Sequence, residues 1–420
     1  MRARVRGRGA SGEAPRHGFA VHWTEAPHPS ISSVMTVHDR DLRPVSGAPP
    51  AAGAAEAGGI LSIDLDAIEA NWKKLASITV PVECAAVLKA DAYGCGLEPV
   101  ARKLVQAGCR TFFVADVPEG RRLRTVTADA PVYVLNGIMP GSAQAFAENS
   151  LHPVINSASE LAEWDAFVAG SGWRGGAALH VDTGMNRTGI TVEEAAALAP
   201  RIHSANHGVM LLLSHLACAE IADHPMNDRQ IRLFREIRIM YRGVPSSLAN
   251  SSGIFLGGTV HCDLVRPGIA LYGANPTPGS QNPMRAVVEL HGRIIQVRTL
   301  NKGDTVGYGA TWSAGRLSRI AIIAVGYADG FLRSAGAAKG KPAAEVLVAG
   351  KRCPLVGRVS MDLIAADVTD LPQGGARRGD FATLIGKGMS VDDLAAGMGT
   401  IAYEVLTSLG RRYHRTYKGA

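Results

Sequence analysis

A lysine at the expected end of a buried strand is the residue in this sequence best suited to covalent chemistry. Residues 82–88 are mostly small, β-branched or apolar and precede Gly94 and Gly96, which predicts a buried strand that ends at Lys89 and enters a turn. Burial favours the neutral amine, which is a nucleophile for carbonyl groups, as in a Schiff base. For Lys89 taken alone, a side chain that reaches solvent is the alternative.

Four further segments place polar groups directly after apolar runs. The backbone N–H groups and hydroxyls of residues 250–253, together with Gly268 and Ile269, are suited to bind a phosphate. A phosphate site beside a strand-end lysine is what pyridoxal phosphate requires, and an arginine can face its pyridine nitrogen. Taken alone, His215 is more typical of a hydrogen-bonded structural histidine, and Arg266 is compatible with an ordinary salt bridge. The four segments are Asp-Thr-Gly-Met-Asn-Arg (182–187), Ser-His (214–215), Asn-Ser-Ser-Gly (250–253) and Arg-Pro-Gly-Ile (266–269).

Strands and helices alternate over the segment that carries these groups. Eight expected strands with amphipathic helices between them predict a parallel (β/α)8 barrel, in which strand ends supply the chemistry at one face. After about residue 283 strands follow one another with few helices, which predicts a β-rich domain. The expected barrel strands are residues 84–88, 111–114, 132–135, 153–155, 177–181, 209–214, 246–248 and 264–272. The later strands are 286–297, 320–325, 345–348, 353–356, 363–367 and 381–384, with a helix at 391–398.

The chain therefore divides into three expected parts. Residues 1–58 lack a hydrophobic period and are expected to be a disordered N-terminal extension, within which Met35 is a candidate start of translation. Residues 59–283 are expected to form the cofactor-binding barrel. Residues 284–420 are expected to form the C-terminal β-domain.

The distribution of charge argues against a nucleic-acid partner. The formal charge of the 420 residues is +7, but residues 1–58 account for +2 and residues 411–420 for +4. Phosphate-tracking proteins concentrate Lys and Arg on the folded surface instead. The six cysteines form no Cys-x-x-Cys pair, so no metal site is indicated, and no apolar run is long enough to span a membrane. A soluble, cytoplasmic protein is expected.

The motifs resemble those of the alanine racemases, a pyridoxal-phosphate-dependent barrel family. The resemblance covers the chain from about residue 59 to its end, with the motifs in the family's order. They are VLKADAYG (87–94), VDTGMNRTG (181–189), LVRPGIALYG (264–273), VGYGATW (306–312), GYADG (326–330), GRVSMD (357–362) and TIAYE (400–404).

The resemblance implies two bases on opposite faces of the substrate Cα. One is Lys89, which also holds the cofactor, and the other is Tyr308 of the partner subunit in a homodimer. A phenol is a weak base at neutral pH, so neighbouring positive charge, relayed from Arg266 through His215, is expected to assist it. The implied product is D-alanine for peptidoglycan. The implied cofactor-binding residues are Lys89, Tyr93, His215, Ser251, Arg266, Gly268, Ile269 and Tyr403, and the implied substrate-binding residues are Arg187, Met361 and Tyr327.

Two positions depart from the family pattern, and of these Cys95, where a histidine is often found, is expected to matter little. Many members carry a carbamate-modified lysine two residues before the signature aspartate, whereas this chain has His180 there. What supports Arg187 in its place is open between His180, a bound anion and another acid. A racemase of broader specificity, for example toward serine, is the nearest alternative function. A decarboxylase would be expected to place a carboxylate where Arg266 stands, and a non-catalytic cofactor carrier would lack the β-domain.

Overall fold

The computed structural model describes residues 52–204, 208–336 and 343–420, and its first half is a closed parallel barrel. Seven strands pair in chain order, and β2, one residue before the first of them, pairs in parallel with the last strand, β10. Asp263 N donates to Ser246 O and Arg266 N to Ala249 O, both at 2.9 Å, which closes the ring between β9 and β10. The strands are β2 (Glu83–Cys84), β3 (Ala86–Val87), β4 (Phe112–Val114), β5 (Val132–Val134), β6 (His152–Ile155), β7 (Ala177–His180), β8 (Val209–Leu213), β9 (Ser246–Ser247) and β10 (Leu264–Val265).

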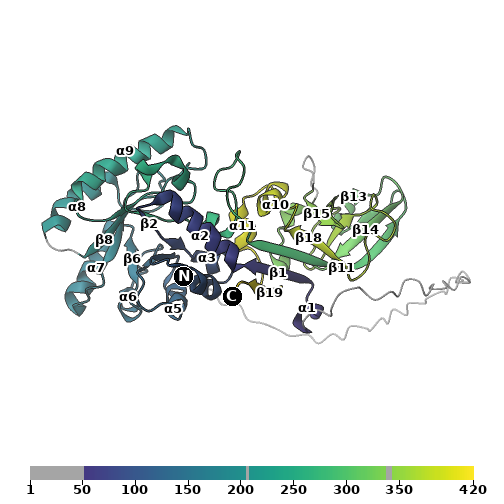
Figure 1. Cartoon of the computed structure of the whole chain (residues 1–420), viewed down its shortest axis with the longest axis horizontal. Coiled ribbons are helices and arrows are strands. Elements are labelled where there is room, and N and C mark those ends of the chain that lie inside the picture. Colours follow the sequence, from purple (N-terminus) through teal and green to yellow (C-terminus); the bar gives the residue numbers. More distant parts are fainter. Residues whose placement is uncertain (1–51, 205–207, 337–342) are drawn as a thin grey trace, which may run out of the picture. The chain divides into compact units, whose positions relative to one another are not determined.

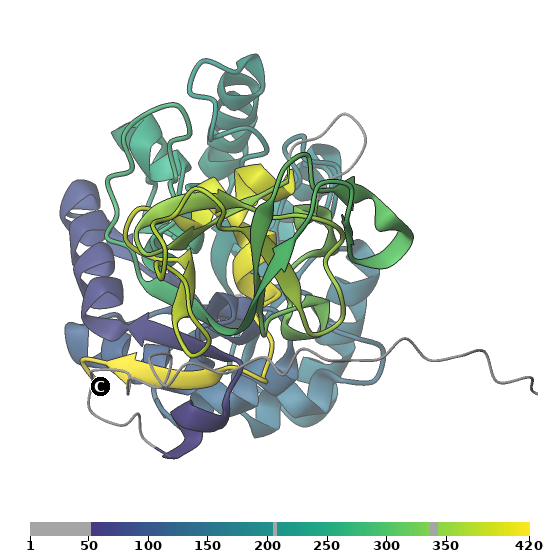
Figure 2. The ribbon, with the colours of Figure 1, turned by 90° about the vertical axis from the view of Figure 1, so that its right-hand side faces the viewer.

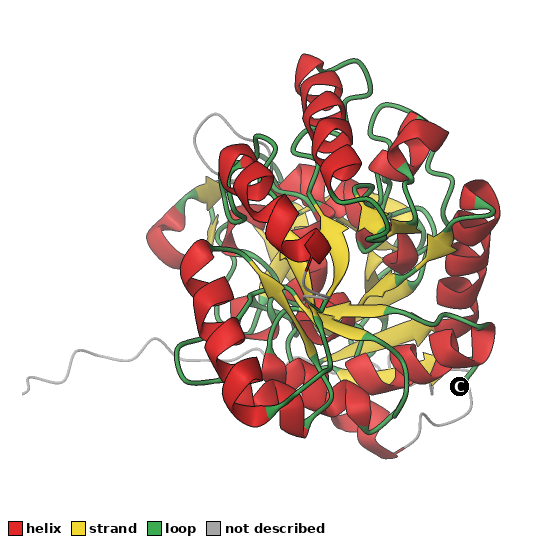
Figure 3. Cartoon of the chain, turned by 90° about the vertical axis from the view of Figure 1, so that its left-hand side faces the viewer, coloured by secondary structure: helices red, strands yellow, loops and turns green. Residues whose placement is uncertain are grey.

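Helices surround the barrel because each carries an apolar stripe toward the strands (Figure 3). In α4, the buried residues Leu97, Val100, Ala101 and Leu104 recur at helical spacing. Side-chain oxygens of Asp64, Asp116 and Ser157 cap α2, α5 and α7. The helices are α2 (Leu65–Thr79), α4 (Leu97–Ala107), α5 (Val117–Arg124), α6 (Ala143–Glu148), α7 (Ala158–Ser171), α8 (Val192–Ser204) and α9 (Pro225–Met240).

The second half is built on a sheet with the strand order β16-β15-β18-β11-β1-β19, to which β14 and β17 are added at β11. Figures 1 and 2 show this part in green to yellow, except for β1, which is purple. Its strands are β1 (Gly59–Asp64), β11 (Val288–Leu300), β14 (Ser318–Ile323), β15 (Glu345–Val348), β16 (Lys351–Pro354), β17 (Ile364–Asp367), β18 (Phe381–Ile385) and β19 (His414–Lys418). A hairpin of β12 (Thr305–Val306) and β13 (Trp312–Ser313) and the helices α10 (Val391–Met398) and α11 (Ala402–Thr407) complete it.

The expected fold class, a (β/α)8 barrel with a C-terminal β-rich part, is confirmed, but three details differ. β1 lies in the second sheet, antiparallel to β11 and parallel to β19, whereas the sequence predicts residues 59–64 to be part of the barrel. The strand expected at 264–272 ends at Val265, because Pro267 has no N–H to continue a ladder, and Ile269–Tyr272 forms the 3₁₀ helix η4.

The third difference lies at the N-terminal side. Residues 1–51 of the expected disordered extension lie outside the described residues. Ala52–Glu56, also expected to be disordered, forms the short helix α1, and Arg293 donates to Ala54 O (2.9 Å). Among the described residues, no helix is both long and apolar enough to cross a membrane.

Candidate functional site

A cavity of about 1050 Å³ opens at the carboxyl ends of the barrel strands. Strand ends on this side of a barrel bring together residues that are distant in sequence. All eight residues expected to bind the cofactor, and Arg187 as well, line this one cavity. They are Lys89, Tyr93, His215, Ser251, Arg266, Gly268, Ile269 and Tyr403.

Lys89 follows β3 and sits among cationic side chains. Burial lowers the pKa of its amine, Arg187 and Arg266 lower it further, and Glu119 opposes them. In the part of the chain that the structure describes, no carboxylate forms an ion pair with any of these three cations. The site therefore combines a nucleophilic amine with positive charge that an anionic ligand can neutralise.

The chain after Lys89 makes a left-handed turn, α3 (Lys89–Tyr93). Residues 90–93 have φ between 53° and 55°, and Gly94 follows at 78°. For each non-glycine residue, this left-handed conformation costs roughly 1–2 kcal/mol relative to the right-handed one. Two backbone bonds of 2.8 Å close the turn, from Ala92 N to Leu88 O and from Gly94 N to Ala90 O. The turn carries Tyr93 from the strand end into the wall of the cavity.

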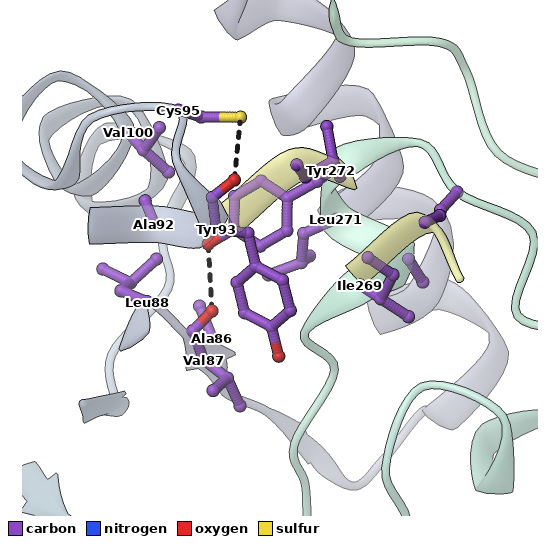
Figure 4. Close-up of a cluster of buried hydrophobic side chains, with 14 of the residues drawn as sticks. Ala86, Val87, Leu88, Ala92, Tyr93, Cys95, Val100, Ile269, Leu271 and Tyr272 are labelled. Atoms are coloured by element: carbon purple, nitrogen blue, oxygen red, sulfur yellow. Dashed lines mark hydrogen bonds between the residues drawn. The ribbon is translucent and has the colours of Figure 1, made fainter. Parts of the chain in front are cut away.

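The Tyr93 ring is held rigidly in that wall. It stacks on Tyr272 with a centroid distance of 4.6 Å, and the Tyr272 hydroxyl donates to Val87 O at 2.9 Å (Figure 4). Burial raises the pKa of Tyr93, so its phenol is protonated and can donate a hydrogen bond. A Cβ added to Gly268 would lie 2.2 Å from the Tyr93 oxygen, so only glycine permits this close approach.

The loops after β9 and β10 meet at Ser251. Its Oγ accepts hydrogen bonds from Gly268 N (2.9 Å) and Ala270 N (3.3 Å). Asn250 Oδ1 accepts from Gly253 N (2.9 Å), which shapes the first loop. Hydroxyls and backbone N–H groups thus gather beside Tyr93, a donor set that fits a phosphate.

Arg266 is 5% exposed and is fixed by neutral partners. Its guanidinium donates to Ser247 Oγ and, at 2.6 Å, to Ser214 O. Burial lowers the pKa of Arg266 to about 10, which leaves it charged at neutral pH. Burial, together with the charges of Arg266 and Arg187, holds the pKa of His215 well below its ordinary value, so its imidazole is neutral.

His180 stands where many family members carry a carbamate-modified lysine, and its hydrogen bonds define its protonation state. Asn156 Nδ2 donates to Leu135 O (3.2 Å) and Val154 O (2.8 Å), which fixes the amide and points Oδ1 at His180 Nδ1, 2.8 Å away. The imidazole therefore carries its proton on Nδ1. Burial and the nearby Arg266 lower the pKa of His180 to about 4, so it is uncharged at neutral pH. His180 cannot supply the negative charge that a carbamate would place near Arg187.

Three expected site residues do not line this cavity. Tyr308, Tyr327 and Met361 lie on the β-rich part with exposed fractions of 71%, 43% and 53%. Tyr308 begins the 3₁₀ helix η5 (Tyr308–Ala310) and Tyr327 begins η6 (Tyr327–Asp329). Ala328 N donates to Met361 O (2.9 Å), so Tyr327 and Met361 lie on bonded segments. We call these three residues the exposed β-face.

Several cavity residues had no sequence signal. Asn136, Met139, Glu220 and Asp392 line the cavity without belonging to any of the motifs. Asp392 Oδ2 accepts from Asn275 N (3.1 Å), so the β-rich part contributes to the wall through α10 as well as through Tyr403 of α11. Asp392 reaches the cavity only because the two parts of the chain are in contact.

Comparison with known proteins agrees with this geometry. The sequence profile of the alanine racemase N-terminal domain matches residues 63–276, and that of the C-terminal domain matches residues 287–417. An alanine racemase of Methylobacterium sp. (strain 4-46) is 49% identical over 360 residues, which cover 86% of this chain and 98% of the relative. A catabolic alanine racemase of Mesorhizobium japonicum is 46% identical over a match that covers 87% of this chain and 94% of the relative.

A solved structure extends the similarity to the fold. Alanine racemase from Bartonella henselae with covalently bound pyridoxal phosphate is 38% identical and matches with a TM-score of 0.81, covering 86% of this chain and 99% of that one. Both domain profiles, the curated relatives and the fold agree along the same residues. The chain belongs to the alanine racemase family.

Proposed function

We propose that this chain is a pyridoxal-phosphate-dependent racemase that interconverts L-alanine and D-alanine. The observation that carries the proposal is one cavity that holds Lys89, the donors at Tyr93 and Ser251, and the buried Arg266. The family supports the same reaction, since the relatives of this chain are alanine racemases.

The residues present fit the cofactor. Tyr93, Ser251 and the backbone at Gly268 are the proposed phosphate ligands, and the charged Arg266 is the proposed partner of the pyridine nitrogen. When bound, pyridoxal phosphate withdraws electrons from the substrate Cα and makes its proton acidic. Arg266 stays protonated and cannot give the ring a proton, which weakens this withdrawal and disfavours transamination.

Racemisation needs one base on each face of the substrate Cα. Lys89 is the proposed base on one face, and its lowered pKa suits that task. Tyr308 of the partner subunit is the proposed base on the other face. Arg187, at the cavity wall, and the backbone N–H of Met361 of the partner subunit are proposed to bind the substrate carboxylate, with Tyr327 at the entrance.

The exposed β-face supports a homodimer with shared sites. Its three side chains lie outside the cavity of their own chain and leave large apolar surface in contact with solvent. Arg412 connects the segments that carry Tyr327 and Met361, because Nε binds Asp329 Oδ1 and Nη1 binds Asp362 Oδ1, both at 2.7 Å. A two-fold interface would place the face of each chain over the cavity of the other.

We further propose supply of D-alanine for peptidoglycan as the biological role and the cytoplasm as its place. The six cysteines are free thiols, which supports a reducing compartment. The catabolic Mesorhizobium relative makes breakdown of D-alanine the competing role. A deletion strain separates them: the biosynthetic role predicts that growth requires added D-alanine.

A racemisation assay with purified enzyme, cofactor and a panel of small amino acids tests the proposed reaction. We expect alanine to give the highest kcat/KM, and serine to be turned over more slowly because one small group changes binding by only about 1–3 kcal/mol. Lys89→Ala should abolish both turnover and the absorbance band of the bound cofactor. An unchanged band in Lys89→Ala, or no turnover of alanine by the intact enzyme, would refute the proposal.

A further inference from the structure

Helix α5 holds the left-handed turn after Lys89 through Glu119. One carboxylate oxygen of Glu119 accepts a hydrogen bond from Asp91 N (3.0 Å), and the other accepts from Ala115 N (2.8 Å). Ala115 directly precedes the Asp116 cap of α5. Glu119 thus connects the start of α5 to Asp91 in the middle of the turn.

Two arginines hold the same turn from outside the barrel interior. One turn along α5, Arg122 forms an ion pair with the Asp91 carboxylate and binds Glu98 (2.7 Å). From β19, Arg415 Nη1 donates to Gly94 O at 2.6 Å. The turn is therefore held at residue 91 by α5 and at residue 94 by the C-terminal strand.

We propose that Glu119 is a positioning residue that fixes the left-handed turn and thereby sets the place of Lys89 and Tyr93 in the site. This inference rests on the proposed role of Lys89. Residues 90–93 have no intrinsic preference for positive φ, so tertiary bonds must impose that conformation. Asp91 lies two residues from Lys89 and two from Tyr93, so a change at its N–H reaches both side chains.

The simpler reading is that Glu119 only stabilises the start of α5. Asp116 caps α5 by accepting from Glu119 N, and the Glu119 carboxylate binds Ala115 N just before that cap. The bond to Asp91 N lies outside the helix and has no part in capping. Two N–H donors approach the two oxygens, and only a carboxylate accepts both, because a glutamine amide would turn its own N–H₂ toward one of them. Glu119 is also the acid that raises the pKa of Lys89 against the surrounding cations.

Glu119→Gln tests the proposal, with Glu148→Gln as the control. Glu148 lies on α6 and bonds Gln144 on its own helix, so the control removes the same charge away from the turn. We expect kcat of Glu119→Gln to fall about tenfold, equivalent to about 1.4 kcal/mol, with KM within about twofold. Amide hydrogen exchange in residues 90–97 should accelerate by a similar factor in the apoenzyme, while the control leaves exchange and kcat unchanged.

Uptake of pyridoxal phosphate by the apoenzyme gives an independent reading. Its rate follows the neutral amine, so removal of the Glu119 charge should move the midpoint of the pH–rate curve to lower pH. Arg122→Gln should also accelerate amide exchange in residues 90–97, but by a smaller factor. This variant provides the exchange measurement if Glu119→Gln fails to fold.

If Glu119→Gln lowers the melting temperature but leaves exchange in residues 90–97 and the midpoint of cofactor uptake unchanged, then Glu119 only stabilises α5 and the proposal is wrong. Failure of the proposed function is distinguishable, because it would show as an unchanged cofactor band in Lys89→Ala, whereas exchange in residues 90–97 reports on the turn itself.

Discussion

Gly268→Ala perturbs the place where the proposed phosphate site is narrowest. The added Cβ would lie 2.2 Å from the Tyr93 oxygen and 2.9 Å from its Cζ, whereas ordinary contact begins at 3.4 Å. The clash on the oxygen is thus 1.2 Å (3.4 minus 2.2 Å). Tyr93 cannot swing aside freely, because its buried ring stacks on Tyr272, which is itself bonded to Val87 O.

Overpacking of this kind costs about 1–3 kcal/mol. If the site relaxes by displacing Tyr93 or the Gly268 backbone, that cost appears as weaker cofactor binding of about 5-fold to 150-fold. Titration of the apoenzyme with pyridoxal phosphate, followed by quenching of intrinsic fluorescence, measures it. Gly258→Ala is the matched control, since no atom lies within 4 Å of its added Cβ. An affinity of Gly268→Ala within twofold of the parent, in a folded protein, would refute the role of this close approach.

Two further predictions concern His180 and Tyr308. The pKa of His180 is about 4 in the folded protein and 6.5 in the unfolded chain, so its contribution to stability is present above pH 6.5 and is lost as the pH falls toward 4. In urea unfolding, this histidine should lower the free energy of unfolding by about 2 kcal/mol between pH 7 and pH 5. His180→Gln should lack this part of the pH dependence, whereas the contributions of Asp and Glu side chains remain. A parent and a variant with equal pH slopes would contradict the buried neutral histidine. Tyr308→Phe should slow solvent-hydrogen exchange at Cα much more for one alanine enantiomer than for the other, and equal slowing of both would remove the two-base scheme.

Much of the fold could be predicted from local pattern. The apolar runs at 345–348 and the helical spacing at 391–398 coincide with β15 and α10. The place of β1 could not be predicted, because its partners β11 and β19 lie more than 200 residues away in the chain and pairing over such distances leaves no local signal. The left-handed turn at 90–93 also escapes sequence reasoning, since Ala, Asp and Tyr do not favour positive φ and contacts with α5 and β19 impose it.

The site residues likewise fall into those that the sequence predicts and those that only the packing of elements reveals. Lys89, Ser251 and Arg266 could be placed from strand ends and motifs, because chemistry at a barrel face follows the strands. Glu119 and Asn156 could not, since each acts by bonding a neighbouring element rather than by belonging to a motif. Their roles depend on which helix and which strand lie side by side.

Each proposed site joins Lys89 of one chain to Tyr308 of another, and mixed dimers test this arrangement most directly. Lys89→Ala and Tyr308→Phe should each be nearly inactive alone. A mixed dimer would hold one doubly defective site and one site with both bases intact, so equal co-expression should restore about one quarter of the parent activity per chain. No recovery in proven mixed dimers, or full activity in a monomer, would contradict the shared site.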